Sequence, residues 1–298
     1  MLEARRQKLA GLAIWFIPLL WAVNYIVARR APGVIDPYSL AALRWGIVCV
    51  LLVLVSRKEL WSARAHLLGK WYQYVALGFF GMLVCGAWVY LGARTTVAMN
   101  ISLIYAASPV LIAVGSVLWL HERFRVRQGV GVALAIVGVV HVIVRGRWTA
   151  LSEVQFVAGD GWIVLAMISW ALYALLQKMW FSPLGSTARL AAICIGSMVV
   201  LLPCAAWELL QPETPPWTWQ ATALGVAAAL VPGLGAYWIY GWAQKILGAS
   251  RVAMTLYLGP LCAALAAWLV LGEPLGWHHL AGAALILPGV FLVTRSGD

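Results

Sequence analysis

The chain has 298 residues, of which 63% are hydrophobic and only 10% are charged, and it contains 18 tryptophans. A soluble domain of average composition is about 45–50% apolar and about 25% charged. A soluble core cannot bury this much apolar surface, and the composition also excludes a disordered chain, a coiled coil and a disulfide scaffold. The composition predicts a protein that lies in a lipid bilayer.

Ten runs of mostly apolar residues are long enough to cross a bilayer as helices, each of which takes about 20 residues. Open sheets and irregular backbone facing lipid would leave amide groups unpaired, and the connections are too short for a soluble domain. The sequence therefore predicts an all-α integral membrane protein with ten transmembrane helices. The runs cover residues 11–29, 38–56, 72–92, 97–120, 126–144, 161–181, 186–207, 219–243, 249–271 and 277–294.

The net charge of +11 would indicate a nucleic-acid partner in a soluble protein, but here it predicts the orientation in the membrane. Most lysines and arginines fall in loops on the same side as the N-terminus. We therefore expect both termini to be cytoplasmic and no nucleic-acid partner. The arginines expected on the opposite side are Arg29, Arg30, Arg94, Arg145 and Arg147.

The chain also repeats itself. Pro109 and Pro260 stand as far apart in the sequence as Glu122 and Glu273. Pairs earlier in the chain, such as Trp21 and Trp170, are separated by slightly fewer residues. We therefore predict two five-helix repeats, in residues 1–150 and 151–298. Because five is odd, the second repeat enters the membrane upside down relative to the first, which is the architecture of many secondary transporters.

Three segments carry a resemblance to a known family. They read DPYSLAALRW (36–45), SLIYAASPVLIAVGSVLWLHERF (102–124) and LYLGPLCAALAAWLVLGEPL (256–275). The pattern resembles the bacterial EamA-type branch of the drug/metabolite transporter superfamily over residues 11–294, and it is most similar to the aromatic amino-acid exporters. The resemblance implies ten helices in inverted repeats and export of small metabolites across the bacterial inner membrane. It does not identify the substrate.

Two stripes on the first and sixth spans, which are repeat mates, combine aromatic rings with amide and hydroxyl groups at helical spacing. Such stripes suit a zwitterion, whose apolar side chain meets rings while its charges meet neutral dipoles. The alternative is packing between helices with incidental hydrogen bonds. The candidate cavity-lining residues are Trp21, Asn24, Tyr25, Trp170, Tyr173 and Gln177, with Trp88, Tyr90, Tyr105, Tyr237, Tyr240 and Gln244 from the third, fourth and eighth spans.

Arg44 is predicted to be the only charge well inside a span. Burying an ionisable group in a membrane costs at least about 2.5–3.5 kcal/mol, so such residues usually have a function. Arg44 is expected either to contact a substrate carboxylate or to anchor the helix by reaching to the outer interface.

Two further sets of residues suggest mechanical roles. Pro232, Gly233 and Gly235 in the eighth span are hinge candidates, because proline removes a backbone donor and glycine permits close approach. Glu122 and Glu273 close the fourth and ninth spans, where we expect them to bind backbone amides or basic neighbours.

Several kinds of chemistry are not expected. No acid lies in the middle of a predicted span, so a carboxylate proton relay is not visible. The five cysteines show no ligand spacing and no enzyme motif is present, so we expect no enzyme, no metal and no cofactor. The partners expected are a small-molecule substrate and the bilayer, with the protein a monomer.

Together the residues predict a secondary transporter of the inner membrane that exports neutral and aromatic amino acids by alternating access. Efflux of drugs or other amphipathic metabolites is the first alternative, since an aromatic lining would serve them equally well. A membrane-embedded assembly or lipid-handling protein with no transport cycle is the second.

Overall fold

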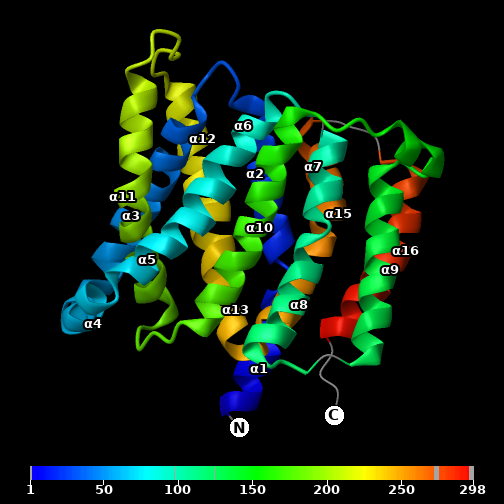
Figure 1. Cartoon of the computed structure of the whole chain (residues 1–298), viewed down its shortest axis with the longest axis horizontal. Coiled ribbons are helices and arrows are strands. Elements are labelled where there is room, and N and C mark those ends of the chain that lie inside the picture. The colour runs from blue at the N-terminus through cyan, green and yellow to red at the C-terminus, as the bar shows by residue number, and fades with distance from the viewer. Residues whose placement is uncertain (1, 97, 124, 272–274, 295–298) are drawn as a thin grey trace.

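The computed structural model describes residues 2–96, 98–123, 125–271 and 275–294. Within these ranges all regular structure is helical, which confirms the predicted fold class (Figure 1). The first half contains α1 (Leu2–Ala13), α2 (Ile17–Arg30), α3 (Pro37–Ser62), α4 (Arg64–Gly69), α5 (Trp71–Gly78), η1 (Phe79–Trp88), α6 (Val89–Ala93), α7 (Ala98–Tyr105), α8 (Ser108–Leu120) and α9 (Val126–Ile143). The second half contains η2 (Trp148–Glu153), α10 (Ala158–Met179), α11 (Ser186–Leu209), α12 (Trp219–Ala228), η3 (Ala229–Ala236), α13 (Tyr237–Leu247), α14 (Ala249–Ala253), η4 (Met254–Leu258), α15 (Gly259–Leu271) and α16 (Trp277–Thr294).

Nine helical segments of the described chain are long and apolar enough to cross a membrane. The tenth predicted span is the helix α16, whose apolar stretch Trp277–Val293 is shorter than the other nine. The predicted number of exactly ten spans is therefore not confirmed. The first span also differs from the prediction, because a turn between α1 and α2 interrupts it.

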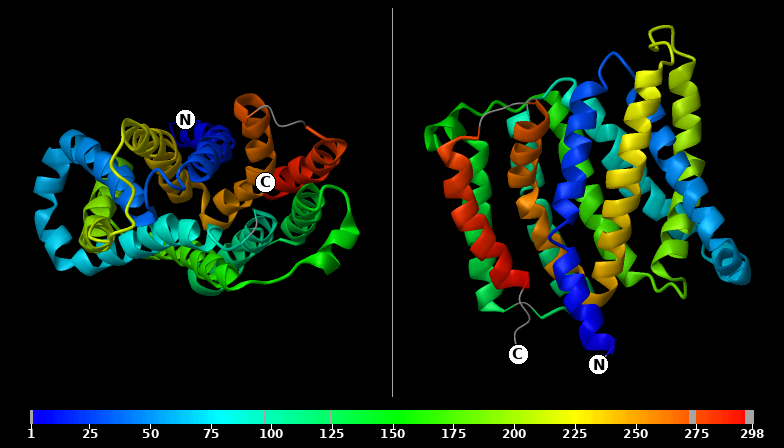
Figure 2. Two further views of the ribbon diagram at one scale, coloured as in Figure 1. Left: turned by 90° about the horizontal axis from the view of Figure 1, so that it is seen from above. Right: turned by 180° about the vertical axis from the view of Figure 1, so that it is seen from behind.

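The helices stand side by side in an elongated bundle (Figure 2). The pair α9 and α16 forms one flank, and α3 with α11 lies towards the other, while α2, α10 and α13 lie between them (Figures 1 and 2). The start of α1 and the end of α16 lie at the same end of the bundle (Figure 1). The middle of the bundle is where residues from both halves meet.

The flank formed by α9 and α16 shows the inverted relation between the halves directly. A Cβ added to Gly131 would lie 2.6 Å from the carbonyl oxygen of Gly289, and one added to Gly138 would lie 2.9 Å from that of Gly282. The two helices are therefore antiparallel. Since Gly131 corresponds to Gly282 in the repeat and Gly138 to Gly289, each contact maps onto the other. A twofold axis perpendicular to the helices, which relates the two repeats, produces such a pair of equivalent contacts.

The pair α3 and α11 carries a second symmetric contact. Near the end of α3, the carboxylate of Glu59 accepts a hydrogen bond from the Gly185 N–H, which precedes α11, at 2.6 Å. Near the end of α11, Glu208 accepts hydrogen bonds from the N–H groups of Tyr38 at 3.2 Å and Ser39 at 2.7 Å, in the first turn of α3. Each acid satisfies amide groups that a helix start leaves without partners. Glu59 and Glu208 have the same sequence separation as Trp21 and Trp170.

The interruptions of the helices also match between the halves. The third predicted span contains the π-helical segment η1, and its repeat mate contains η3 in the corresponding place. The α-helix also breaks in the fourth and ninth spans, shortly before Pro109 and Pro260, each the second residue of the helix that follows. Proline suits that position because its missing N–H would have no helical partner there.

Candidate functional site

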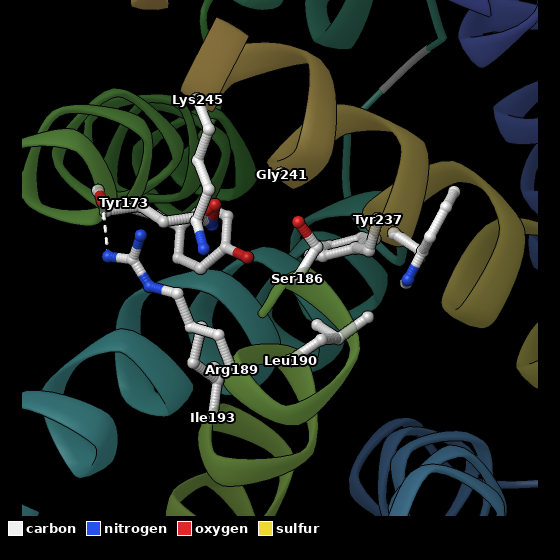
Figure 3. A pocket seen from close by; sticks show the side chains of 10 residues that line it. Tyr173, Ser186, Arg189, Leu190, Ile193, Tyr237, Gly241 and Lys245 are labelled. Carbon is white, nitrogen blue, oxygen red and sulfur yellow. Dashed lines mark hydrogen bonds between the residues drawn. The ribbon is translucent and has the colours of Figure 1, made fainter. Parts of the chain in front are cut away.

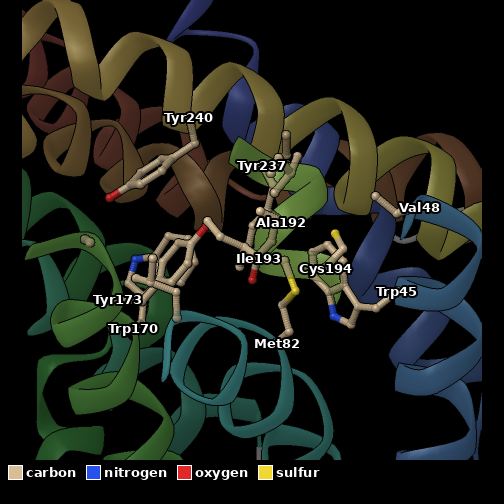
Figure 4. Close-up of a cluster of buried hydrophobic side chains, with 14 of the residues drawn as sticks. Trp45, Val48, Met82, Trp170, Tyr173, Ala192, Ile193, Cys194, Tyr237 and Tyr240 are labelled. Carbon is tan, nitrogen blue, oxygen red and sulfur yellow. The ribbon is translucent and has the colours of Figure 1, made fainter. Parts of the chain in front are cut away.

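An aromatic cluster fills the middle of the bundle, where α2, α10 and α13 meet (Figure 4). Trp21 of α2 lies 5.2 Å from Trp170 and 5.6 Å from Tyr240, measured between ring centroids. Trp170 lies 5.4 Å from Tyr173, 5.6 Å from Tyr237 and 5.1 Å from Tyr240. The structure therefore brings together five of the predicted residues, from both repeats. We call these five side chains the aromatic cluster.

Trp45 of α3 extends the cluster, and sequence reasoning did not single it out. Its ring is fully buried and meets Tyr237 edge to face, with centroids 4.7 Å apart. Within the described chain, the indole nitrogens of Trp45 and Trp170 and the hydroxyl of Tyr240 are buried without a hydrogen-bond partner. Buried polar groups in proteins are nearly always paired. The rings therefore present unused donors inside an otherwise apolar space.

Arg44 lies beside this cluster and is only 5% exposed. Its guanidinium carbon lies 4.7 Å from the ring centroid of Trp45 and 5.8 Å from that of Tyr237. The side chain is buried against these rings, which fits either a substrate contact or an anchoring role. Trp45 and Tyr237 offer its cation the negative faces of their rings.

The polar partner of Arg44 is an amide. Its Nη1 donates to Asn24 Oδ1 at 3.1 Å, and the Tyr90 hydroxyl donates to the same oxygen at 3.0 Å. Arg44 forms no ion pair with any residue that the structure describes, and its Nε is buried without a partner. The cation is therefore held by dipoles and rings but is not neutralised. Tyr25, predicted to share this face, has a side chain outside the described residues.

Other predicted site residues lie elsewhere or serve packing. Trp88 pairs with Trp162, with centroids 5.2 Å apart. Gln244 is buried, and its amide nitrogen donates to the Ala174 carbonyl at 2.7 Å, which joins α13 to α10. Tyr105 packs against the edge of the main core.

The hinge candidates lie in the π-helical segment η3. Tyr237 is the first residue of α13, directly after η3. Its hydroxyl donates to the Gly81 carbonyl of η1 at 2.7 Å, so this hydrogen bond ties η1 to the residue that follows η3. Gly81 has no room for a side chain, because an added Cβ would lie 2.5 Å from the Tyr173 ring. An added Cβ on Gly233 would lie 3.4 Å from Arg44 Nε. Single-turn π-bulges in helices are frequent at functional sites.

The space next to the cluster is small in this conformation. A cavity of about 10 Å³, lined by Tyr173, Gln177, Tyr237 and Gly241 among others, has room for about one water molecule. A whole amino acid does not fit there. This cavity is therefore too small for a whole substrate beside the aromatic cluster.

Comparison with known proteins identifies the family. The model of the EamA-like transporter family matches residues 9–144 and again residues 157–295, which together make up most of the chain. The chain belongs to the EamA-like transporter family. It is therefore a multi-pass membrane transporter with the two-repeat fold of that family, as the resemblance in the sequence predicted.

Two relatives named as uncharacterized transporters match over almost the full length. The chain is 26% identical to the uncharacterized transporter YyaM of Bacillus subtilis (strain 168), over 92% of this chain and 89% of the relative. It is 26% identical to an uncharacterized transporter of Archaeoglobus fulgidus, over 93% of this chain and 94% of the relative. A solved crystal structure matches with a TM-score of 0.76 at 18% identity, covering 96% of this chain and 97% of that one, which shows the shared fold.

Two buried charges in this EamA-family protein were missed by sequence reasoning. Arg189 was expected only as one of the cytoplasmic-side charges and Glu208 only as an acid near a span end, and both are buried in the end turns of the span Ser186–Leu209. Because both lie in the end turns of α11, they do not contradict the prediction that Arg44 is the only charge well inside a span. Glu59 and Glu208 are separated in the sequence by the same number of residues as Trp21 and Trp170. That repeat spacing could have indicated that the two acids bind the starts of α11 and α3.

The predicted role of Glu122 agrees with its contacts. Its carboxylate accepts hydrogen bonds from the Ala249 N–H at 2.9 Å, the Ser250 N–H at 3.3 Å and the Ser250 hydroxyl at 2.8 Å. Glu122 thus joins the end of the fourth span to the start of the ninth span. Its repeat mate Glu273 lies outside the described residues.

Proposed function

We propose that this EamA-family transporter exports neutral amino acids, aromatic ones included, across the bacterial inner membrane by alternating access. The observation that carries the proposal is the buried arginine beside the aromatic cluster. Arg44 has no acidic partner in the described chain, although leaving a charge unpaired in a membrane is costly. A solute that brings a carboxylate to Arg44 and an apolar side chain to the rings would remove that cost.

The substrate class follows from the two components of this site, the guanidinium group of Arg44 and the aromatic rings. Guanidinium groups bind carboxylates with paired, charge-assisted hydrogen bonds, whereas they repel ammonium groups. Aromatic rings suit both an apolar side chain and an ammonium group, the latter through their negative faces. A zwitterion with an apolar side chain therefore matches the site better than a lipophilic cation does.

Alternating access is supported by the symmetry of the fold. Inverted repeats can adopt two arrangements that open to opposite sides of the membrane, because each half can take the conformation of the other. Both halves also share local irregularities of their helices, namely the π-helical segments η1 and η3 and the breaks before Pro109 and Pro260.

Orientation is the first prediction to test. Single cysteines in loops 145–160 and 208–217 are expected to react with a membrane-impermeant maleimide added to whole cells, because few lysines and arginines lie on that side. Cysteines in 57–71 and 121–127 are expected to react only after the cells are permeabilised. The protein with its five native cysteines is the blank. The reverse labelling pattern would contradict the assignment of both termini to the cytoplasm.

Efflux of amphipathic drugs is the second candidate, and the aromatic cluster is the observation that favours it. Bacteria that express the protein are expected to grow in toxic p-fluorophenylalanine at concentrations that stop cells with an empty vector. No protection against ethidium, a flat cation, is expected because Arg44 is positive. Protection against ethidium alone would replace amino-acid export by drug efflux.

A further inference from the structure

A second group of basic side chains lies at one end of the bundle, away from Arg44. Arg189 in the first turn of α11 and Lys245 near the end of α13 line one small cavity together with Ser186 (Figure 3). Arg189 is only 6% exposed, whereas Lys245 is exposed at the mouth. Tyr173 and Tyr237 of the aromatic cluster line the same cavity.

The hydrogen bonds of these two cations go to backbone carbonyl groups, and the carboxylate of Glu59 also attracts Lys245. Arg189 Nη2 donates to the carbonyl oxygens of Gln177 and Trp180, and Lys245 Nζ donates to that of Leu184 at 2.9 Å. Neither cation forms an ion pair with a residue in the described ranges. Carbonyl dipoles orient a cation but do not cancel its charge. This end of the bundle therefore carries positive charge that its hydrogen bonds leave in place.

Helix capping explains only part of this arrangement. Arg189 holds the last carbonyls of α10, a favourable place for a cation at a helix end. Capping does not account for Arg189 Nε, which is buried and has no partner among the described residues. It also does not explain why Lys245 from another helix lines the same cavity. The acid Glu59, which accepts the Gly185 N–H at 2.6 Å, offsets part of the charge of Lys245 but forms no ion pair with Arg189 in the described chain.

We propose that Ser186, Arg189 and Lys245 form a binding site for a carboxylate group at this mouth of the transporter. The site would hold the acid group of a solute before it reaches Arg44, and for the identity of that solute it rests on the proposed function. Tyr237 connects the two positions, because it lines this cavity and also lies 5.8 Å from the Arg44 guanidinium. The charge distribution predicts that this mouth faces the cytoplasm.

The cavity as it stands admits at most one oxygen of a carboxylate and no whole solute. About 10 Å³ has room for one group of the size of a water molecule, which is also the size of one carboxylate oxygen. The rest of the solute would remain outside until the halves move apart. The phosphate of a lipid headgroup shares this anionic chemistry, so the experiment has to separate the two sources.

The test measures anion affinity at Ser186 without relying on transport. The variant Ser186→Cys is treated in detergent micelles with two thiosulfonate reagents, one carrying a sulfonate and the other a trimethylammonium group. Each rate is divided by the rate with free β-mercaptoethanol, and the native protein is the blank. The sulfonate reagent is expected to react at least about fivefold faster after this correction, and phenylacetate, unlike phenethyl alcohol, is expected to slow it.

A matched pair of lysines tells a local site from general surface charge. Adding Lys245→Gln to the Ser186→Cys variant is expected to abolish most of its preference for the sulfonate reagent, together with the protection by phenylacetate. Adding Lys178→Gln is expected to leave both unchanged, because Lys178 Nζ donates to the Gln244 carbonyl at 3.3 Å and does not line the cavity. Lys245 is preferred to Arg189 for this test, since losing Arg189 also frees the end of α10.

Equal corrected rates for the two reagents, or equal effects of the two lysine changes, would overturn the site. Repeating the test in nanodiscs separates solute from lipid. With phosphatidylglycerol, the protection by phenylacetate is expected to persist as it does with phosphatidylcholine. Loss of the protection in phosphatidylglycerol alone would assign the site to a lipid headgroup. This test measures thiol reaction rates and no flux. It would therefore still show whether an anion binds at this mouth if the protein did not export amino acids.

Discussion

Replacing Arg44 by glutamine is expected to slow phenylalanine export about 10- to 100-fold while the flux of phenethylamine, which lacks the carboxylate, changes much less. A hydrogen bond to a charged group contributes about 1.5–3 kcal/mol, which corresponds to that range in rate or affinity. Glutamine keeps a side-chain N–H donor for Asn24, and Tyr90 keeps its own hydrogen bond to Asn24, so the fold is expected to lose little stability. Flux is measured in sealed proteoliposomes at matched protein density.

Arg94 provides the matched control for Arg44. Its Nη2 pairs with Asp36 Oδ1 at 3.0 Å, and the side chain is 57% exposed. Exposed ion pairs contribute little, so Arg94→Gln is expected to leave both fluxes close to those of the parent. Equal losses for phenylalanine and phenethylamine in Arg44→Gln would assign Arg44 a structural role and remove the carboxylate from the proposed site.

Gly289→Ala is expected to destabilise the protein by about 1–3 kcal/mol, because it inserts a methyl group where α9 and α16 touch. The added Cβ would lie 2.6 Å from the Gly131 carbonyl oxygen and 2.8 Å from the Ala135 nitrogen, and backbone atoms cannot move aside as a flexible side chain can. Thermal unfolding in detergent, followed by size-exclusion chromatography, measures the effect.

The same exchange at Gly161 is the control, because an added Cβ there meets nothing within 4 Å. Alanine is the better helix former by about 0.8–1.0 kcal/mol, so Gly161→Ala is expected to leave the melting temperature unchanged or to raise it. Gly289→Ala should therefore melt below the parent, and Gly161→Ala should melt at or above it. A melting temperature for Gly289→Ala at or above that of the parent would contradict the close packing of the α9 and α16 backbones.

Much of the fold could be predicted from sequence, because membrane helices are read from apolar runs and repeats from matched positions. Trp21 and Trp170, chosen as repeat mates, are in contact in the structure. The pairing of Gly131 with Gly289 is not visible in the sequence alone. The repeat relates Gly131 to Gly282, and only the inverted packing decides which glycine it touches.

The site was harder to predict, because helical spacing shows which residues share a face but not which helix that face meets. Trp45 was not predicted, because it directly follows Arg44 and adjacent residues of a helix do not share a face. Arg189 was missed because its place in the first turn of α11 resembles a loop position. Burial at helix ends depends on the neighbouring helices, and hydropathy along one segment cannot reveal it.

The measurement that tests the central claim most directly is the efflux of radiolabelled phenylalanine from sealed proteoliposomes without ATP. The account predicts that vesicles containing the protein release phenylalanine faster than protein-free vesicles, that release saturates with concentration, and that unlabelled tryptophan competes. The account would be contradicted if these vesicles were no leakier than empty ones to phenylalanine and to a panel of other neutral amino acids.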